Sequence, residues 1–290
     1  MFFGSIPALV TPFAAGRVNE AAFRELVEWQ IDEGSNALVP CGTTGEAATL
    51  TAEEHSRIIE ITVEVARGRV PVIAGCGSNN TAHAIELTNS AKAAGADAVL
   101  HVPPYYNRPN QEGIYNHLAA VADLGIPVVL YNVPARTITD IAVETMARLS
   151  RLPNVIAVKD ATGNLGRVSD QRRACGAEFI QLSGNDETAL AFNAMGGVGC
   201  ISVTANVAPR LCSEFQDAMR EGRWDEALTL QDRLYPLHTA LFTDASPGPV
   251  KYAMTRVRPG FSMELRPPMT EPSDASRKAV DAALAHAGLI

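Results

Sequence analysis

The sequence predicts an α/β fold, a (β/α)8 TIM barrel with a C-terminal helical appendage. Eight short apolar runs alternate with amphipathic stretches, and this strict alternation indicates a parallel sheet covered by helices. The runs are almost continuously apolar, as expected of strands buried on both faces. Their number and the chain length of 290 residues fit a closed barrel. We therefore expect the barrel in residues 1–222 and the helical region in residues 223–290.

An apolar run marks each predicted strand. In chain order the runs are IPALV (6–10), ALVP (37–40), VPVIAG (70–75), AVLHV (98–102), IPVVLYNV (126–133), NVIAVK (154–159), EFIQLSG (178–184) and VGCISV (198–203). Amphipathic stretches such as 20–34 and 81–96 lie between them and predict helices. Glycines that favour positive φ follow several of these helices, at Gly34, Gly68, Gly95 and Gly125. Candidate N-caps are Thr51, Thr81 and Asp140.

The strand pattern stops at about residue 205. The remaining amphipathic stretches predict helices over 210–222, 223–242, 247–257 and 276–288. The first completes the barrel as its eighth helix, and the others form the appendage. A doubly wound open sheet is the alternative architecture. Such a sheet normally carries a GxGxxG turn after an early strand, and none follows the first predicted strand.

Composition and charge exclude several classes of function. The net charge of −8 argues against nucleic-acid binding, because phosphate contacts need clustered cations. No apolar run reaches the roughly 18–20 residues of a membrane span, and the N-terminus lacks the basic start of a signal peptide. The five cysteines form no CxxC pair, which indicates buried thiols in a reducing cytoplasm. The six histidines show no metal-ligand spacing, so no metal site is predicted.

One lysine is in an unusual position. The chain has four lysines, and Lys92, Lys251 and Lys278 lie in helical patterns where a solvated amine is expected. Lys159 instead ends an apolar strand, and in barrels the chemistry lies at the C-terminal ends of the strands. Desolvation disfavours a charged amine, and a neutral amine attacks a ketone to form a Schiff base. The alternative is a lysine that extends to the solvated rim.

Other strand ends carry groups that suit the same chemistry. Tyr131 ends the neighbouring strand and is a candidate proton donor and acceptor. Thr43 and Thr44, in CGTTGE, offer hydroxyls for a proton relay and backbone N–H groups for a carboxylate. Their alternative role is a helix-capping turn. Arg136 follows YNVPA and suits a substrate carboxylate, unless it forms a surface ion pair with Asp140 or Asp160.

Two tyrosines form a stiff aromatic loop, framed by prolines in PPYYNRP. The simplest role for Tyr105 and Tyr106 is packing at a subunit interface. Such packing does not exclude a part in catalysis.

The motifs GTTGEAATL, PPYYNRP, YNVPART, VKDATGN and SGND resemble those of the 4-hydroxy-tetrahydrodipicolinate (dihydrodipicolinate) synthase family, within the N-acetylneuraminate lyase superfamily of class I aldolases. The resemblance runs from about residue 2 to the C-terminal helices, with every motif in order. It implies condensation of pyruvate with aspartate 4-semialdehyde, in the diaminopimelate route to lysine. It also implies a homotetramer arranged as a dimer of dimers, with no cofactor and no catalytic metal.

The resemblance also implies a role for each site residue. Lys159 is the Schiff-base lysine, and Tyr131 is the acid/base tyrosine. Thr43 relays protons between Tyr131 and Tyr106, which reaches in from the neighbouring subunit. Thr43 and Thr44 hold the carboxylate of pyruvate, and Arg136 meets the carboxylate of aspartate semialdehyde. The residues that line the pocket are Gly184 and Ile201.

Family members that lysine inhibits bind it in a cleft at the dimer interface. The matching positions here are Ala47, Ala48, Ala52, His55, Asn79, His83 and Tyr105. His55, Asn79 and Tyr105 fit the inhibited pattern. His83 replaces a glutamate that meets the ammonium of the inhibitor, and Ala52 replaces a polar residue of some relatives. We therefore expect weak inhibition or none.

Three other functions compete with this one. A sugar-acid lyase of the same superfamily would share Lys159 and Tyr131 but would lack an arginine at position 136. A phosphosugar enzyme would use the glycines after the last two strands, yet no basic residue accompanies them. A non-catalytic barrel used for binding or assembly would leave a desolvated lysine and its partners unexplained.

Overall fold

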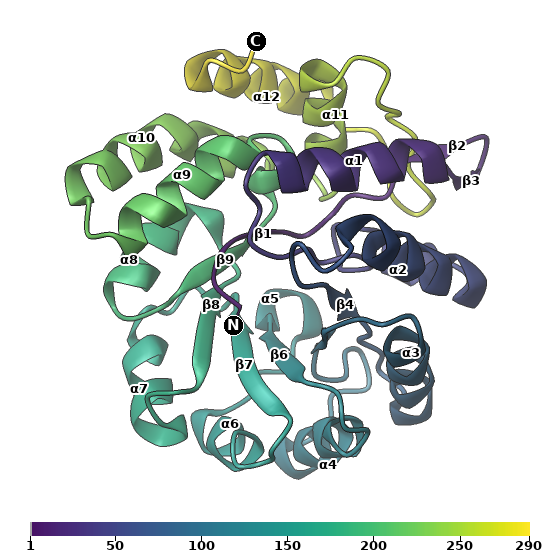
Figure 1. Cartoon of the computed structure of the whole chain (residues 1–290), viewed down its shortest axis with the longest axis vertical. Helices are drawn as coiled ribbons and strands as arrows, with labels where there is room; N and C mark the ends of the chain where they lie inside the picture. Colours follow the sequence, from purple (N-terminus) through teal and green to yellow (C-terminus); the bar gives the residue numbers. More distant parts are fainter. Residues whose placement is uncertain (1) are drawn as a thin grey trace.

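The computed structural model describes residues 2–290 and confirms the predicted barrel with its C-terminal helices (Figure 1). The strands of its main sheet are β1 (Gly4–Pro7), β4 (Ile73–Gly75), β5 (Ala98–His101), β6 (Val128–Asn132), β7 (Val155–Asp160), β8 (Ile180–Ser183) and β9 (Gly199–Ser202). They are parallel in the order β1-β9-β8-β7-β6-β5-β4. A small hairpin, β2 (Phe13–Ala14) and β3 (Arg17–Val18), follows the first strand and was not predicted.

Helices surround the strands, as Figure 1 shows. They are α1 (Glu20–Asp32), α2 (Ala52–Ala66), α3 (Thr81–Ala93), α4 (Gln111–Ala122), α5 (Pro134–Thr137), α6 (Val143–Leu149), α7 (Gly166–Cys175), α8 (Ala189–Ala194) and α9 (Pro209–Arg220). Three 3-10 turns are η1 (Ala47–Thr49), η2 (Asp186–Thr188) and η3 (Thr204–Asn206). The appendage consists of α10 (Trp224–Ala240), α11 (Gly248–Val257) and α12 (Asp274–Ala287), and α12 packs against α10 and α11. Within residues 2–290, none of the helices is both long and apolar enough to cross a membrane.

The predicted second strand closes the barrel, although it forms only isolated bridges. Ala8 pairs with Val39, and Leu38 pairs with Val72, so the segment joins the two ends of the sheet. Its ladder is short because proline has no N–H group to donate, and prolines stand at positions 40 and 71.

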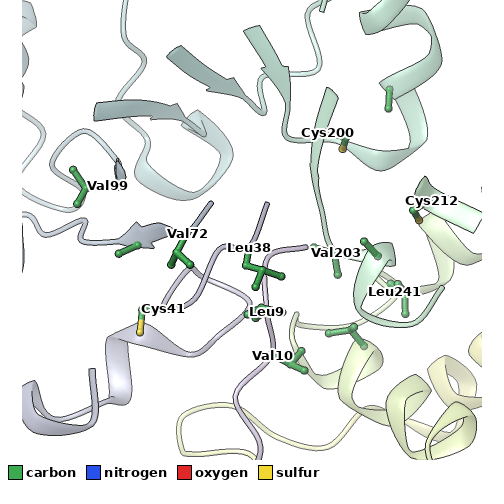
Figure 2. Packing of buried hydrophobic residues seen from close by; sticks show 14 of the residues in the cluster. Leu9, Val10, Leu38, Cys41, Val72, Val99, Cys200, Val203, Cys212 and Leu241 are labelled. Atoms are coloured by element: carbon green, nitrogen blue, oxygen red, sulfur yellow. The ribbon is translucent and has the colours of Figure 1, made fainter. Parts of the chain in front are cut away.

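Side chains alternate between the inside and the outside of the barrel. The interior cluster contains Ile6, Ile73, Val129 and Ile201. Their chain neighbours face the surrounding helices, and Figure 2 shows this outer layer with Leu38, Val72, Val99 and Cys200 labelled. Because the period is two, the inward set on each strand also fixes which polar side chains enter the barrel.

Helix starts agree with the sequence prediction in part. Thr51 caps α2 and forms a capping box with Glu54. Asn80, one residue before the predicted Thr81, caps α3. The prediction for Asp140 was wrong: its side chain instead accepts a hydrogen bond from Asn132, 2.7 Å away.

Candidate active site

The register of β6 and β7 places two candidate catalytic residues side by side. Tyr131 pairs with Lys159 in the parallel ladder. Tyr131 lies in the interior cluster, so strand alternation directs both side chains into the barrel. The Nζ atom of Lys159 lies 4.1 Å from the centroid of the Tyr131 ring. The candidate nucleophile and the candidate proton-transfer group are thus close together at the C-terminal ends of neighbouring strands.

Lys159 is enclosed by the barrel. Its side chain is buried, and it forms no ion pair within residues 2–290. Gly184, after β8, leaves the space that it occupies, because a Cβ atom at position 184 would lie 3.1 Å from Cε of Lys159 and 2.7 Å from Cβ of Ala161. Ile201, on β9, is also part of the apolar wall. These neighbours bury most of the Lys159 side chain.

The GTTGE segment forms a tight turn above the barrel. Its backbone closes through hydrogen bonds from Gly45 to Gly42 (3.1 Å) and from Glu46 to Thr43 (3.1 Å). Thr44 is buried, whereas Thr43 is exposed and lines a cavity. In the described residues, the backbone N–H groups of Thr43 and Thr44 donate to no protein acceptor. Adjacent free N–H groups in a turn form an anion-binding site.

A cavity of about 380 Å³ opens over the strand ends. Thr43, Tyr131 and Arg136 line it from three different loops or strands, and Tyr105 forms part of the rim. Lys159, Gly184 and Ile201, which were predicted to belong to the site, are not among the residues that line this cavity, and Tyr106 faces solvent. The volume suits a small keto acid together with a second small substrate.

Arg136 is available to a substrate. It is exposed and forms no ion pair within residues 2–290. The surface ion pair that we considered for it belongs to Arg167, which lies 3.3 Å from both Asp140 and Asp160. The role of Arg167 was missed in the sequence, because no motif links α7 to residue 140.

Arg167 also holds the ends of β6 and β7 in place. Asp160 accepts hydrogen bonds from Arg167, from Gln171 at 2.8 Å and from the backbone of Thr162 at 2.9 Å. Asp140 accepts from Asn132, which follows Tyr131. One connected network therefore fixes the residues that follow Tyr131 and Lys159, and a DxT pattern after the strand is its only sequence signal.

The aromatic loop presents apolar surface beside the cavity. Tyr106 is 89% exposed and has a φ of 71°, in the left-handed region. Ile138, on the neighbouring loop, is 66% exposed with a φ of 60°. Thr139 donates a hydrogen bond of 3.1 Å to the carbonyl of Pro104, which ties the two loops together. These two exposed side chains therefore lie on loops that are tied to each other.

The residues of the predicted lysine cleft border the same cavity. Ala47, Ala48, Ala52, His55, His83 and Tyr105 line it, whereas Asn79 holds the neighbouring loop through its carbonyl, 2.8 Å from Nδ2 of Asn107. His55 is buried, with Nε2 2.8 Å from the carbonyl of Gly75. Burial lowers the pKa of His55, although that carbonyl opposes the shift. His83 is exposed and contacts Ser78 at 3.3 Å.

Comparison with known proteins gives one consistent result. A profile of the "Dihydrodipicolinate synthetase family" matches residues 1–287. The 4-hydroxy-tetrahydrodipicolinate synthases of Rhizorhabdus wittichii and Zymomonas mobilis are 62% and 60% identical, over the full length of both chains.

Solved structures agree with these sequences. Dihydrodipicolinate synthase from Aquifex aeolicus superposes with a TM-score of 0.96 at 42% identity, over 99% of each chain. The Acinetobacter baumannii enzyme, solved in complex with pyruvate, gives 0.96 at 43% identity over 100% of each chain. The chain belongs to the dihydrodipicolinate synthetase family.

Proposed function

We propose that this lyase condenses pyruvate with L-aspartate 4-semialdehyde, the 4-hydroxy-tetrahydrodipicolinate synthase reaction, through a Schiff base on Lys159. The contact between Lys159 and Tyr131 inside the barrel carries the proposal, because an enclosed amine beside a proton-transfer group is what imine formation needs. The names of the full-length relatives support the substrates.

The reaction begins when the amine of Lys159, after loss of its proton, attacks the ketone carbon of pyruvate. Loss of water gives the imine, and Tyr131 supplies and accepts the protons that these steps move. The protonated imine withdraws electrons, so the methyl carbon loses a proton and becomes a nucleophilic enamine. That carbon then attacks the aldehyde of the second substrate.

Two anion sites orient the substrates. The free N–H groups of Thr43 and Thr44 receive the carboxylate of pyruvate. Arg136, at the cavity wall, pairs with the carboxylate of aspartate semialdehyde, because its planar fork suits two carboxylate oxygens.

The complete site includes a second subunit in this proposal. Tyr106 of one subunit reaches Thr43 of its neighbour and completes the proton relay from Tyr131. The solvent-facing position of Tyr106 and the adjoining exposed Ile138 support this arrangement. The family resemblance supports a dimer of dimers. We also propose a cytoplasmic location, which the five free cysteines support.

Reduction with borohydride in the presence of pyruvate tests the mechanism. Peptide mass mapping should find the label on Lys159, with loss of activity in proportion to labelling. A label on Lys92, Lys251 or Lys278 would contradict the assignment. A product assay with aspartate semialdehyde and, separately, with 2-keto sugar acids then distinguishes a synthase from a sugar-acid lyase.

A further inference from the structure

Lys251, on α11, is not the solvated lysine that its helical pattern predicts. Its side chain is 0% exposed, and its Nζ atom lies 2.5 Å from Oε1 of Glu46, whose side chain is 1% exposed. Nζ also donates to the carbonyl of Glu264 at 2.7 Å and lies 4.3 Å from the centroid of the Phe13 ring. Burial lowers the pKa of Lys251, and the charge of Glu46 opposes that shift.

The second carboxylate oxygen of Glu46 is held by the loop that follows α11. Oε2 accepts a hydrogen bond of 3.0 Å from the backbone of Arg266. The Arg266 guanidinium pairs with Glu54 of α2 at 2.5 Å and donates to the carbonyl of Thr49 at 2.9 Å. Figure 1 shows this loop running from the appendage towards α2. The C-terminal chain therefore holds both ends of the segment from Glu46 to Glu54.

Glu46 is the last residue of the GTTGE turn, and its backbone is left-handed, with a φ of 56°. This conformation is unfavourable for a residue with a Cβ atom and persists where the surroundings enforce it. The N–H of Glu46 donates to the carbonyl of Thr43, so the position of Glu46 fixes the curvature of the turn. Thr11 adds a hydrogen bond of 2.8 Å to the carbonyl of Gly45.

We propose that the Glu46–Lys251 ion pair positions the Thr43–Thr44 turn to bind the carboxylate of pyruvate. Glu46 and Lys251 are then positioning residues for the reaction. The inference rests on the proposed function of the turn. A buried ion pair adds little stability compared with apolar packing, but removal of one partner leaves a buried charge that the surrounding backbone must rearrange to solvate. The backbone of the GTTGE turn, which is strained at Glu46, would undergo this rearrangement.

The test measures the pyruvate concentration that half-saturates borohydride labelling of Lys159 in the intact enzyme, without the second substrate. Glu46→Gln and Lys251→Met should each raise this half-saturating concentration about tenfold, which corresponds to about 1.4 kcal/mol. The double variant should raise it about threefold, because it keeps the Arg266 contact and leaves no buried charge. Glu28→Gln, which breaks the exposed pair with Arg69, is the matched control and should leave it unchanged.

Three results separate the possible failures. Single variants that are folded and keep the parental half-saturating concentration, with only a lower Tm, would overturn the inference and leave the ion pair a purely structural feature. If the single variants do not fold, the double variant decides, and a parental value again overturns the inference. Thr43→Pro tests the function of the turn itself, because it removes one of the two N–H groups at a turn position that tolerates proline. If this variant binds pyruvate normally, the proposed carboxylate site is wrong, whatever the ion-pair variants show.

Discussion

Replacement of Lys159 with methionine should increase the stability of the protein while abolishing imine formation. The Lys159 side chain is 5% exposed and has no ion-pair partner within residues 2–290. A buried polar group without partners costs about 1–3 kcal/mol. The ring of Tyr131, 4.1 Å from Nζ, offsets about 0.5–1 kcal/mol of this cost. Methionine has a similar length and volume, so little packing is lost.

The net gain in the free energy of unfolding is therefore about 1 kcal/mol, or a rise in Tm of about 2 °C. Thermal unfolding measured at equal protein concentration, which controls for subunit dissociation, gives the value. The exposed Lys278→Met is the control and should stay within about 0.5 kcal/mol of the parent. If Lys159→Met loses about 1 kcal/mol or more, the amine has a stabilising partner and the reasoning fails.

Three further predictions concern the shared site, regulation and pH. Inactive Tyr106→Phe and Lys159→Ala subunits should regain activity when they are mixed and reassembled, and inactive mixtures that contain hybrids would exclude a shared site. Sub-millimolar L-lysine should leave initial rates unchanged, because His83 cannot neutralise an ammonium, and loss of a buried charge partner costs about 2–5 kcal/mol. His83→Glu should strengthen inhibition, and half-inhibition of the parent well below about 1 mM would refute this account of His83. Burial lowers the pKa of His101 from 6.5 to about 3. The unfolded chain therefore binds a proton that the folded chain does not, and stability falls as the pH drops below 6.5. When the pH is lowered from about 7.5 to about 5.5, the free energy of unfolding measured in urea should fall by about 1.4 kcal/mol less in His101→Gln than in the parent. An equal fall in both proteins would contradict the shift.

The barrel could be predicted from the sequence because strand and helix periodicities are local. Apolar runs of a few residues show where the strands are, and the register of β6 with β7 then follows from packing of the sheet. A lysine at the end of such a run stands out even when its contacts are unknown, so Lys159 could be identified from the sequence. The same argument placed Tyr131 and Thr43 at strand ends beside the cavity.

Contacts between distant segments could not be predicted in this way. Lys251 lies in an ordinary amphipathic pattern, and its partner Glu46 is near the other end of the chain. The prediction for Asp140 failed for a similar reason. Asn132 and Arg167 both bind its carboxylate, and no side chain caps the nearest helix, α6. Local propensity cannot reveal which of several polar partners the tertiary fold brings close.

The hydrogen bond from Arg266 to Glu46 has a consequence for synthesis of the chain. The two residues are 220 positions apart, so the first half of the barrel leaves the ribosome long before the loop that holds its turn. At about 5–20 residues per second, the interval is about 10–45 s. We expect the early strands to collapse in that interval around a turn that is still unable to hold a keto acid. Pyruvate trapping on stalled nascent chains should therefore begin only once residue 266 has emerged, and earlier labelling would show that the turn forms unaided.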